Sequence, residues 1–564
     1  MKEKVTKRFK RIGSMCLALL MSATLIAGCG QSNTNTNATP SSSATPSATP
    51  SSTGTPEPEV IEGGFTRGIT LDSPGTVNIF AFAEGQNYQK VLDKFHEITK
   101  DSLKTTVNFQ WATKIKDEQP LKLAEKGDID LIFDAAWVNM ASNVSQGMYQ
   151  DLSKYFNNPD YPGLQKAFPA EVIEAMRNPS DGAIYGVPFF SEYNNLATIF
   201  IRGDWREELG CQPVVDEATL EAYLKAVDEN KAKLGATSAA GLGDRAWYYF
   251  RNDTYTNQAK NIFEIAGTGA RITQYAYALL NDAQNEVVDI MYIGDPGSEH
   301  PQFPNGNFMN TKTIEFSQRW ARYINEDAVS ISGQDVLDKF KAGLYGAIEK
   351  ELGAYSDTLS GLQKYDPDAR LEFYFYDKEL GNKETAYMNQ FIANNYMFVP
   401  YFNDDPDRAM AVLDWNFQCQ ANNDLFSRGL EGEDWEAVGE KGYRELYPDN
   451  KYTFPSWLWS VSAAYSRTDA DLPAEVAEYF AYAKDSAKFK TSPIAGFSFN
   501  TKPVELEYTA FTTAQQNYYP LFMNGLFGSE TEEKLNEFYE STKEYSSAIK
   551  DELKKQLNEY FKNK

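Results

Sequence analysis

Residues 183–205 alternate between apolar and polar blocks in a way that predicts two buried strands joined by a polar link. The apolar runs Ile184–Phe190 and Leu196–Ile201 are rich in β-branched and aromatic residues, and a glycine and a proline within the first run disfavour a helix. The segment Ser191–Asn195 between them is polar and aromatic. We interpret this stretch as a hinge strand that leaves one globular lobe and enters another; a hairpin inside a single domain is the alternative.

Strands and helices alternate before this stretch. Apolar runs and helical periodicity predict strands at Thr76–Phe82, Thr105–Trp111 and Asp128–Asp134, with helices over Tyr88–Ile98 and around Leu121–Lys126. This order predicts a parallel sheet covered by helices, followed by a further helix near Asn139–Tyr155. In such sheets, ligands bind beyond the carboxyl ends of the strands.

The pattern is helical beyond the hinge stretch until two later apolar runs. These runs, Leu371–Tyr376 and Asn395–Tyr401, predict strands. We interpret Asn389–Tyr401 as the return crossing to the first lobe. The segments Gly243–Phe250 and Gly294–Gly306 are predicted to be loops or short elements.

Two helices in the last third of the chain have clear signatures. Asp405 as the N-cap and Pro406 at the first helical position predict a helix that continues to Trp415. A stripe of apolar residues opposite a face rich in Lys and Glu predicts a long helix over about Thr531–Phe561. Its acidic residues favour docking on the protein's own lobes over binding to a membrane surface.

The N-terminus has the composition of a secretory signal. A basic segment, Met1–Arg11, precedes the apolar stretch Met15–Ala27 and the small residues before Cys29. The sequence Ile-Ala-Gly-Cys resembles a bacterial lipobox, which implies cleavage before Cys29 and diacylglycerol on its sulfur. The alternative is a secreted protein in which this cysteine is incidental. No later stretch is long and apolar enough to span a membrane.

A tether and an acidic body follow the signal. Residues 29–64 consist mostly of Ser, Thr, Asn, Pro and Ala, and this composition predicts a disordered tether. The formal charge is −25, or about −30 without the basic signal, which argues against nucleic acid and anionic lipid as partners. Aromatic residues make up 14% of the chain, enough to supply a stacking groove as well as the core.

The chain offers few residues for metal or covalent chemistry. Apart from the anchor cysteine, the chain without its signal has two cysteines, Cys211 and Cys419. We expect two separate buried thiols, with one disulfide as the alternative. His96 and His300 are the only histidines. We therefore expect no metal, no cofactor and no histidine-based catalytic triad.

Three motifs resemble parts of enzyme sites, and none of them predicts an enzyme. The segment His96–Lys100 begins like a zinc motif but lacks its second histidine. The segment Gly241–Ala246 formally fits a dinucleotide-binding glycine pattern, but residues 236–240 before it do not have the pattern of a strand, so we expect a loop. Acidic pairs such as Glu349 with Glu351 could serve a glycosidase; we interpret them as solvated acids and helix caps.

Ligand-binding candidates come from strand ends, the hinge and aromatic pairs. A carboxylate there can accept hydrogen bonds from the hydroxyl groups of a ligand, and an aromatic ring offers a face for stacking. Trp457 and Trp459 would face the same side of a strand. The candidates are Glu84, Trp111, Asp134, Trp137, Glu192, Tyr193, Trp247, Tyr248, Trp457 and Trp459.

The order of these features resembles the extracellular solute-binding lipoproteins of bacterial ABC importers. The lipobox, the tether, the strand–helix opening, the Tyr-Gly-Val-Pro-Phe crossing and the helix after Asn403 carry the resemblance. The segments Gly429–Gly432 and Gly496–Phe499, which precede the final helix, are similar to a carbohydrate-type subgroup of large Gram-positive members. The resemblance implies an α/β fold, a two-lobed clamshell like periplasmic binding proteins, with several inter-lobe crossings. It transfers no ligand residue, and only Cys29 is carried over.

The predicted organisation follows from the resemblance and the pattern together. We expect a signal peptide at 1–28, the tether at 29–64, the first lobe at 65–190 and 394–460, the second lobe at 191–393, and a C-terminal region at 461–564 packed on the lobes. We expect a monomeric, lipid-anchored receptor on the extracellular face of the cell membrane. It would capture a carbohydrate, most readily an oligosaccharide, and deliver it to an ABC-importer permease without being an enzyme. The alternatives are a secreted glycoside-active enzyme and an envelope lipoprotein without a small ligand.

Overall fold

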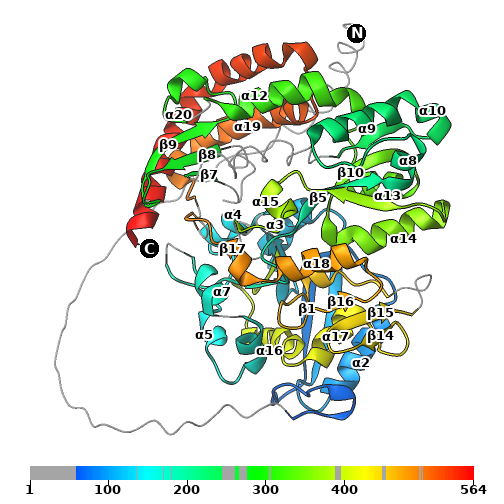
Figure 1. The fold of residues 1–564 in the computed structure, drawn as a ribbon. Helices are drawn as coiled ribbons and strands as arrows, with labels where there is room; N and C mark the ends of the chain where they lie inside the picture. Colours follow the sequence, from blue (N-terminus) through cyan, green and yellow to red (C-terminus); the bar gives the residue numbers. More distant parts are fainter. Residues whose placement is uncertain are drawn as a thin grey trace, which may run out of the picture. The chain divides into compact units, whose positions relative to one another are not determined.

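The computed structural model describes residues 59–563 apart from residues 136, 169, 179–180, 244–260, 266–275, 304–305, 388–394, 447–451, 495–496 and 498. The predicted signal peptide, Cys29 and most of the tether lie outside the described residues, as do Trp247 and Tyr248. The described chain forms two lobes, each built around its own mixed sheet (Figure 1).

A five-stranded sheet in the order β2-β1-β3-β13-β4 forms the first lobe. Its strands are β1 (Gly75–Phe82), β2 (Thr105–Ala112), β3 (Leu131–Ala135), β4 (Gly186–Pro188) and β13 (Asn395–Phe398). β1 pairs in parallel with β2 and β3, which confirms the predicted parallel sheet for these strands. β13 returns from the second lobe and runs antiparallel to β3 and β4.

Helices surround this sheet and complete its core. They are α2 (Gln89–Thr99), α3 (Ile115–Glu125), α4 (Met140–Ser145), α5 (Ser153–Phe156), α6 (Pro162–Ala167), α7 (Ala170–Ala175), α16 (Pro406–Asn416) and α17 (Gln420–Arg428). The predicted cap of α16 is confirmed, since the Asp405 carboxylate accepts a hydrogen bond from the Arg408 amide at 3.2 Å. The single helix predicted at Asn139–Tyr155 is wrong. Gly147, with φ of 69°, ends α4, and the chain turns before α5.

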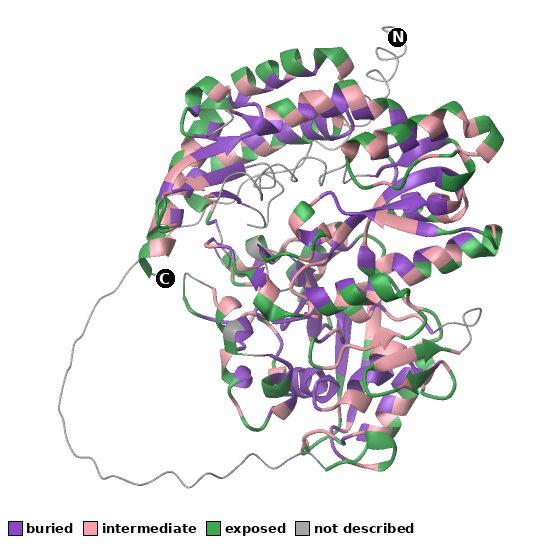
Figure 2. Ribbon diagram, viewed as in Figure 1, coloured by how far each residue is buried: buried purple, intermediate pink, exposed green. Residues whose placement is uncertain are grey.

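A four-stranded sheet in the order β11-β5-β10-β6 forms the base of the second lobe. Its strands are β5 (Ala197–Arg202), β6 (Ser238–Gly241), β10 (Tyr345–Glu351) and β11 (Leu371–Tyr374). Alternate residues of β5 enter different cores: Ile199 and Ile201 face one, and Phe200 faces the other. The sheet is therefore buried on both faces, as its continuous apolar sequence predicts (Figure 2).

Strand β6 corrects a prediction. The pattern of residues 236–240 does not predict a strand, yet Ser238–Gly241 pairs in parallel with β10. A Cβ on Gly241 would lie 2.3 Å from the Tyr345 ring, so only glycine permits this packing. Small residues have weak strand propensity, and here the close approach of neighbouring side chains decides the conformation.

The second lobe also contains an antiparallel three-stranded sheet and several helices. The strands are β7 (Ile262–Glu264), β8 (Ala276–Leu280) and β9 (Val287–Tyr292). The helices are α8 (Gly203–Glu208), α9 (Glu217–Glu229), α10 (Lys231–Leu234), α12 (Phe308–Glu315), α13 (Gly333–Lys341), α14 (Tyr355–Tyr365), α15 (Lys378–Gly381) and α18 (Ala474–Ala483). Small strands complete the description: β12 (Ala386–Tyr387), β14 (Trp435–Val438), β15 (Gly442–Glu445), β16 (Thr468–Asp469) and β17 (Phe489–Lys490).

The C-terminal region packs on the second lobe through two long helices. The predicted long helix is present as α20 (Thr531–Asn563), and α19 (Glu505–Met523), which the pattern does not predict, runs beside it (Figure 1). The apolar stripe of α20, including Leu535, Phe538 and Ile549, is buried in the same core as β8 and β9. The C-terminal region is therefore part of the second lobe's core.

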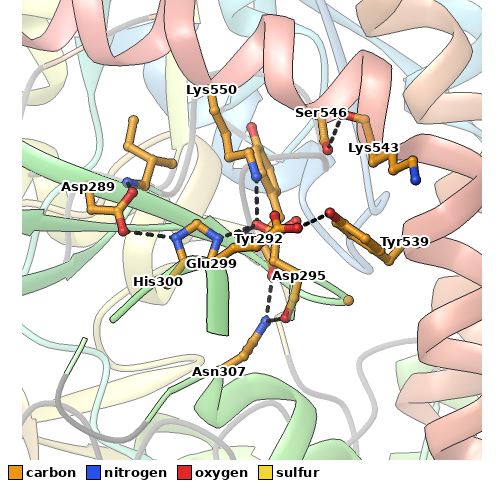
Figure 3. A network of polar contacts seen from close by, with 12 residues as sticks. Asp289, Tyr292, Asp295, Glu299, His300, Asn307, Tyr539, Lys543, Ser546 and Lys550 are labelled. Atoms are coloured by element: carbon orange, nitrogen blue, oxygen red, sulfur yellow. Dashed lines mark hydrogen bonds and ion pairs between the residues drawn. The ribbon is translucent and has the colours of Figure 1, made fainter. Parts of the chain in front are cut away.

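A polar network also fastens α20 to the segment after β9 (Figure 3). The Asp295 carboxylate, 2% exposed, accepts hydrogen bonds from the Tyr292 amide at 2.7 Å and from Lys550 Nζ at 2.9 Å. His300 lies between Asp289 and Asp295, with its ring nitrogens 2.9 Å and 3.2 Å from their carboxylate oxygens. Burial opposes the charged imidazolium, but these two acceptors raise the pKa of His300 to about 9.

The described chain passes between the two lobes three times. It leaves the first sheet after β4 and enters the second at β5, and it returns between β12 and β13. A third passage separates Trp459, in the core of the first lobe, from Val476, in a core of the second. This topology confirms the expected two-lobed fold with several crossings.

Three further features bear on the expected chemistry. Cys211 and Cys419 are free thiols, and they are half-buried where we expected them buried. Among the described residues, His, Cys, Asp and Glu do not gather in any group of three or more that could hold a metal ion. In the same part of the chain, no helix has the length and apolar character needed to cross a bilayer.

Candidate ligand-binding surface

Three aromatic side chains meet at the carboxyl ends of β1 and β3. Phe82 ends β1, Trp137 follows β3, and Trp457 lies in the short 3-10 helix Ser456–Leu458. Both indoles pack edge-on against Phe82, with ring centroids 5.6 Å away for Trp137 and 5.2 Å away for Trp457. Trp457 is 39% exposed, while Phe82 and Trp137 are half-buried. We call Phe82, Trp137 and Trp457 the aromatic platform.

Asn395, at the start of β13, joins the two tryptophans of the platform. Its Oδ1 accepts a hydrogen bond from Trp137 Nε1 at 2.9 Å, and its Nδ2 donates to the Trp457 carbonyl at 3.2 Å. The fully buried Phe133 ring lies under the group, 5.2 Å from Phe82. The platform is thus fixed from below by packing and from the side by an amide.

The loop between β1 and α2 is held against the segment that leads to Trp457. The Gln86 amide donates to Thr453 Oγ1 at 2.8 Å, and the Thr453 amide donates to the Gln86 carbonyl at 3.1 Å. A Cβ on Gly85 would lie 1.8 Å from the Thr453 carbonyl oxygen, so only glycine fits there. Ala83 has φ of 60°, a left-handed conformation that non-glycine residues rarely adopt and that is found more often at functional sites.

One basic side chain borders the platform. Lys116, on α3, places Nζ 5.5 Å from the centroid of the Trp137 ring. This is the distance of a cation–π contact, worth about 0.5–1 kcal/mol when exposed. The ammonium also gives an otherwise acidic protein a hydrogen-bond donor beside the ring.

Trp111 belongs to a second, adjoining aromatic group. It stacks on Phe109 with centroids 5.1 Å apart, and its Nε1 donates to Tyr88 Oη at 3.0 Å. Phe454 closes the group at 6.1 Å from Trp111. Trp111 is half-buried, with one face and its only donor already engaged.

Asp134 is buried rather than presented to a ligand. It is fully covered, and burial raises its pKa against the opposing effect of its hydrogen bonds. Its carboxylate accepts from the Tyr149 hydroxyl at 2.6 Å, the Asn143 amide at 2.8 Å and the Asn139 backbone at 3.0 Å. These contacts hold the loop that carries Trp137, so Asp134 supports the platform without facing a ligand.

The predicted strand with Trp457 and Trp459 on one side is wrong. The segment forms a 3-10 helix, so neighbouring residues do not alternate between two faces. Trp459 is completely buried, 5.4 Å from Phe109, whereas Trp457 is exposed. Only Trp457 of this pair reaches the surface.

The other acidic and aromatic candidates lie apart from the platform or at its border. Glu84 is exposed in the β1–α2 loop. Tyr193 lies in the first passage between lobes, where its amide donates to the Ala483 carbonyl at 2.9 Å and its ring stacks on Phe489. Glu192 beside it is half-buried, and burial raises its pKa to about 7, with Lys484 opposing the shift and Glu351 adding to it.

The sequence did not single out Phe82 and Asn395 as site residues. The sequence pattern places Phe82 at a strand end and Asn395 at the start of a later strand, but neither position by itself indicates a ligand contact. Asn395 is 258 residues from Trp137 and 62 from Trp457. The sequence offers one indication of a role for Asn395, namely that a polar residue begins an otherwise apolar strand. Only the fold shows what its side chain contacts.

Solved structures of solute-binding proteins match this chain over most of its length. The N-glycan transport solute binding protein NgtS from Streptococcus pneumoniae, in complex with Man1GlcNAc, has a TM-score of 0.64 at 16% identity, covering 86% of this chain and 100% of its own. The alginate-binding protein AlgQ2 has a TM-score of 0.57 at 13% identity, covering 88% and 99%. FusA from Streptococcus pneumoniae, an ABC-transporter substrate binding protein in complex with kestose, has a TM-score of 0.55 at 10% identity. The match covers 87% of this chain and 100% of FusA. The chain has the fold of solute-binding proteins.

Sequence comparisons add one match. The family described as "Domain of unknown function (DUF3502)" matches residues 493–562, which contain α19 and most of α20. No curated protein sequence matches the chain. By their descriptions, NgtS is a transport solute binding protein and FusA is an ABC-transporter substrate binding protein.

Proposed function

We propose that the protein is a lipid-anchored extracellular receptor that binds an oligosaccharide and delivers it to an ABC-importer permease. The observation that carries this proposal is the aromatic platform, which lies at the carboxyl edge of the first lobe's sheet. Ligands of open α/β sheets bind at that edge. Stacking of an aromatic ring on the apolar face of a sugar, with amide and ammonium groups beside it, is the chemistry this surface offers.

The solved structures with this fold support the ligand class. NgtS was determined with Man1GlcNAc and FusA with kestose, and AlgQ2 is described as alginate-binding. Our chain has its own aromatic residues at the edge of the first sheet. A carbohydrate of two or more sugar units would use both Trp137 and Trp457.

Anchoring at Cys29 is the second part of the proposal. A basic segment, an apolar segment and an Ile-Ala-Gly-Cys sequence precede the tether. Cleavage before Cys29 would leave the folded body on a tether at the outer face of the membrane. Metabolic labelling with a fatty acid should mark the intact chain and leave Cys29→Ser unlabelled; labelling of the serine variant would refute the anchor.

Thermal-shift screening of a chain that begins at Glu59 tests the binding function. Mannose- and N-acetylglucosamine-containing oligosaccharides, fructose-based oligosaccharides and alginate oligosaccharides should be compared with peptides and monosaccharides. A ligand that binds only the folded state raises the melting temperature. We expect at least one oligosaccharide to do so, and shifts by peptides alone would refute the assignment.

Trp137→Ala and Trp457→Ala should each weaken binding of that oligosaccharide at least about tenfold, equivalent to about 1.4 kcal/mol. Isothermal titration calorimetry measures the loss. Tyr365→Ala is the matched control, because Tyr365 is 72% exposed on α14 and takes no part in the platform. Equal affinity of all three variants, or release of reducing sugar by the wild-type protein, would contradict the proposal.

A further inference from the structure

Among the described residues, the side-chain amide of Asn395 supplies the hydrogen bonds that tie Trp137 to the segment of Trp457. An indole N–H only donates and a backbone carbonyl only accepts, so one orientation of the amide satisfies both bonds. A carboxamide is therefore matched to this position, since it presents an acceptor and a donor at the same time. Alanine could make neither bond, and aspartate could make only the first.

The backbone of Asn395 connects the same point to the passages between the lobes. Asn395 is the first described residue after the second passage, and its carbonyl accepts a hydrogen bond from the Phe189 amide at 3.0 Å, where β4 leads into the first passage. It also pairs with Ala135, the last residue of β3, two residues before Trp137. Three chain segments that are distant in sequence are thus held by one residue.

We infer that Asn395 is a positioning residue for ligand binding: it sets the spacing and orientation of the two tryptophans and links them to the crossing strands. The inference rests on the proposed function of the platform. Phe82 and Phe133 support both indoles by packing, which is not directional, and Asn395 adds the directional hydrogen bonds that join them. Two rings in a fixed relation match two sugar faces of one chain, so losing this restraint affects oligosaccharides more than monosaccharides.

A double-mutant cycle tests whether Asn395 acts through Trp137. Asn395→Ala should weaken oligosaccharide binding about tenfold, within the range of coupling between contacting residues. In the Trp137→Phe background, whose ring has no N–H to donate, the same substitution should cost less than about threefold. Wild-type affinity of Asn395→Ala, or losses that simply add in the double variant, would overturn the inference.

Fluorine NMR of protein labelled with 5-fluorotryptophan tests the positioning without any ligand. Trp137→Phe and Trp457→Phe assign the two resonances by their disappearance. Asn395→Ala should shift both, and Asn395→Asp, which keeps an acceptor for Trp137 but opposes the Trp457 carbonyl, should shift mainly that of Trp457. Unchanged resonances in both variants would refute the role of Asn395, and Asn395→Asp serves alone if the alanine variant does not fold.

Asn403→Ala is the matched control in both experiments. Asn403 lies five residues beyond the end of β13, and its side chain likewise makes one bond of each kind, donating to the Asp130 carbonyl at 3.1 Å and accepting from the Asp405 amide at 2.8 Å. Within the described part of the chain, its side chain bonds to Asp130 and Asp405 and to no aromatic residue of the platform. Its loss should leave both tryptophan resonances and the affinity unchanged. If no oligosaccharide binds the wild-type chain, the proposed function fails, whereas the fluorine spectra still decide the role of Asn395.

Discussion

The role and the pKa of a single polar residue in this protein depend on the groups that surround it. Asp134 and Glu192 look alike in the sequence, each an acid at the end of an apolar run. Asp134 is buried and satisfied by several donors from its own lobe. Glu192 is half-buried near Lys484, and the pKa of that lysine is lowered by burial against the attraction of Glu192. Burial therefore outweighs attraction for both members of the Glu192–Lys484 pair.

Glu192→Gln should stabilise the ligand-free protein at alkaline pH. The folded pKa of Glu192 is about 7, above the ordinary value of 4.5, so the fold prefers the neutral form. The stability due to this preference is complete below about pH 4.5 and is lost as the pH rises through 7. At pH 8.5 the variant should exceed the wild type by about 1–3 kcal/mol in free energy of unfolding, and at pH 5 by little.

Urea unfolding at the two pH values measures this difference. Glu532→Gln, an exposed glutamate at the start of α20, is the control and should change neither value. An identical pH dependence for wild type and Glu192→Gln would contradict the prediction.

Helix α20 is held on the second lobe by an apolar stripe and by a few polar contacts. Its stripe supplies the buried area, while Lys550 and the Asp295–His300 pair fix where the helix lies along β9. Lys554 adds a bond to the Val288 carbonyl at 2.7 Å, and Asn558 accepts from the Val287 amide at 2.8 Å. The periodicity predicts the stripe, but the acceptors for its lysines come from a segment about 250 residues earlier.

His300→Gln should destabilise the protein most at acid to neutral pH. The pKa of His300 is raised to about 9, so its charged form stabilises the fold fully below about pH 6.5, and this contribution is lost as the pH rises through 9. The variant should be less stable by about 2–3 kcal/mol at pH 6 and nearly equal to the wild type at pH 9.5. Urea unfolding across this range provides the measurement.

His96→Gln is the natural comparison, since the chain has two histidines. Burial lowers the pKa of His96, partly opposed by Asp93, and its Nε2 accepts from the Val107 amide at 2.9 Å. The wild type should therefore lose stability relative to this variant as the pH falls below 6.5, the opposite direction to His300. The same pH trend in both variants would refute the assignment of His300.

The whole molecule is organised by three passages between two sheets. Strand β13 is the clearest case. It belongs to the first sheet and pairs with β4, yet its first residue, Asn395, comes 207 residues after Pro188, the last residue of β4. Proteins of this architecture close around a ligand by movement at a few connecting residues. Binding energy shared between lobes would then favour a closed form.

Small-angle X-ray scattering should detect this closure. The radius of gyration of the chain beginning at Glu59 should fall when a saturating oligosaccharide is added, because a ligand held by both lobes would favour the closed form. Trp137→Ala at the same ligand concentration should show a smaller change, in proportion to its lower occupancy. A scattering curve unaffected by a ligand that calorimetry shows to bind would contradict closure.

The sequence by itself determined the elements that have strong local signals. The strands β1, β2, β5 and β13, the helix α2, the capped helix α16 and the long helix α20 follow from hydrophobic periodicity and from Asp405 and Pro406, because these signals arise between residues close in the chain. The α/β class, the parallel pairing of the first strands and the crossing near Ser191–Asn195 follow in turn. The anchor at Cys29 and the tether stay predictions from composition.

Only the tertiary structure decided which candidate residues meet. It buried Asp134 and Trp459, left Trp457 at the surface, and made Ser238–Gly241 a strand where small residues give no local signal. It also brought Asn395 to Trp137 and Trp457 across long sequence separations. The physical reason is common to all of these: burial and partner choice depend on contacts between distant segments, and no local pattern of side chains encodes them.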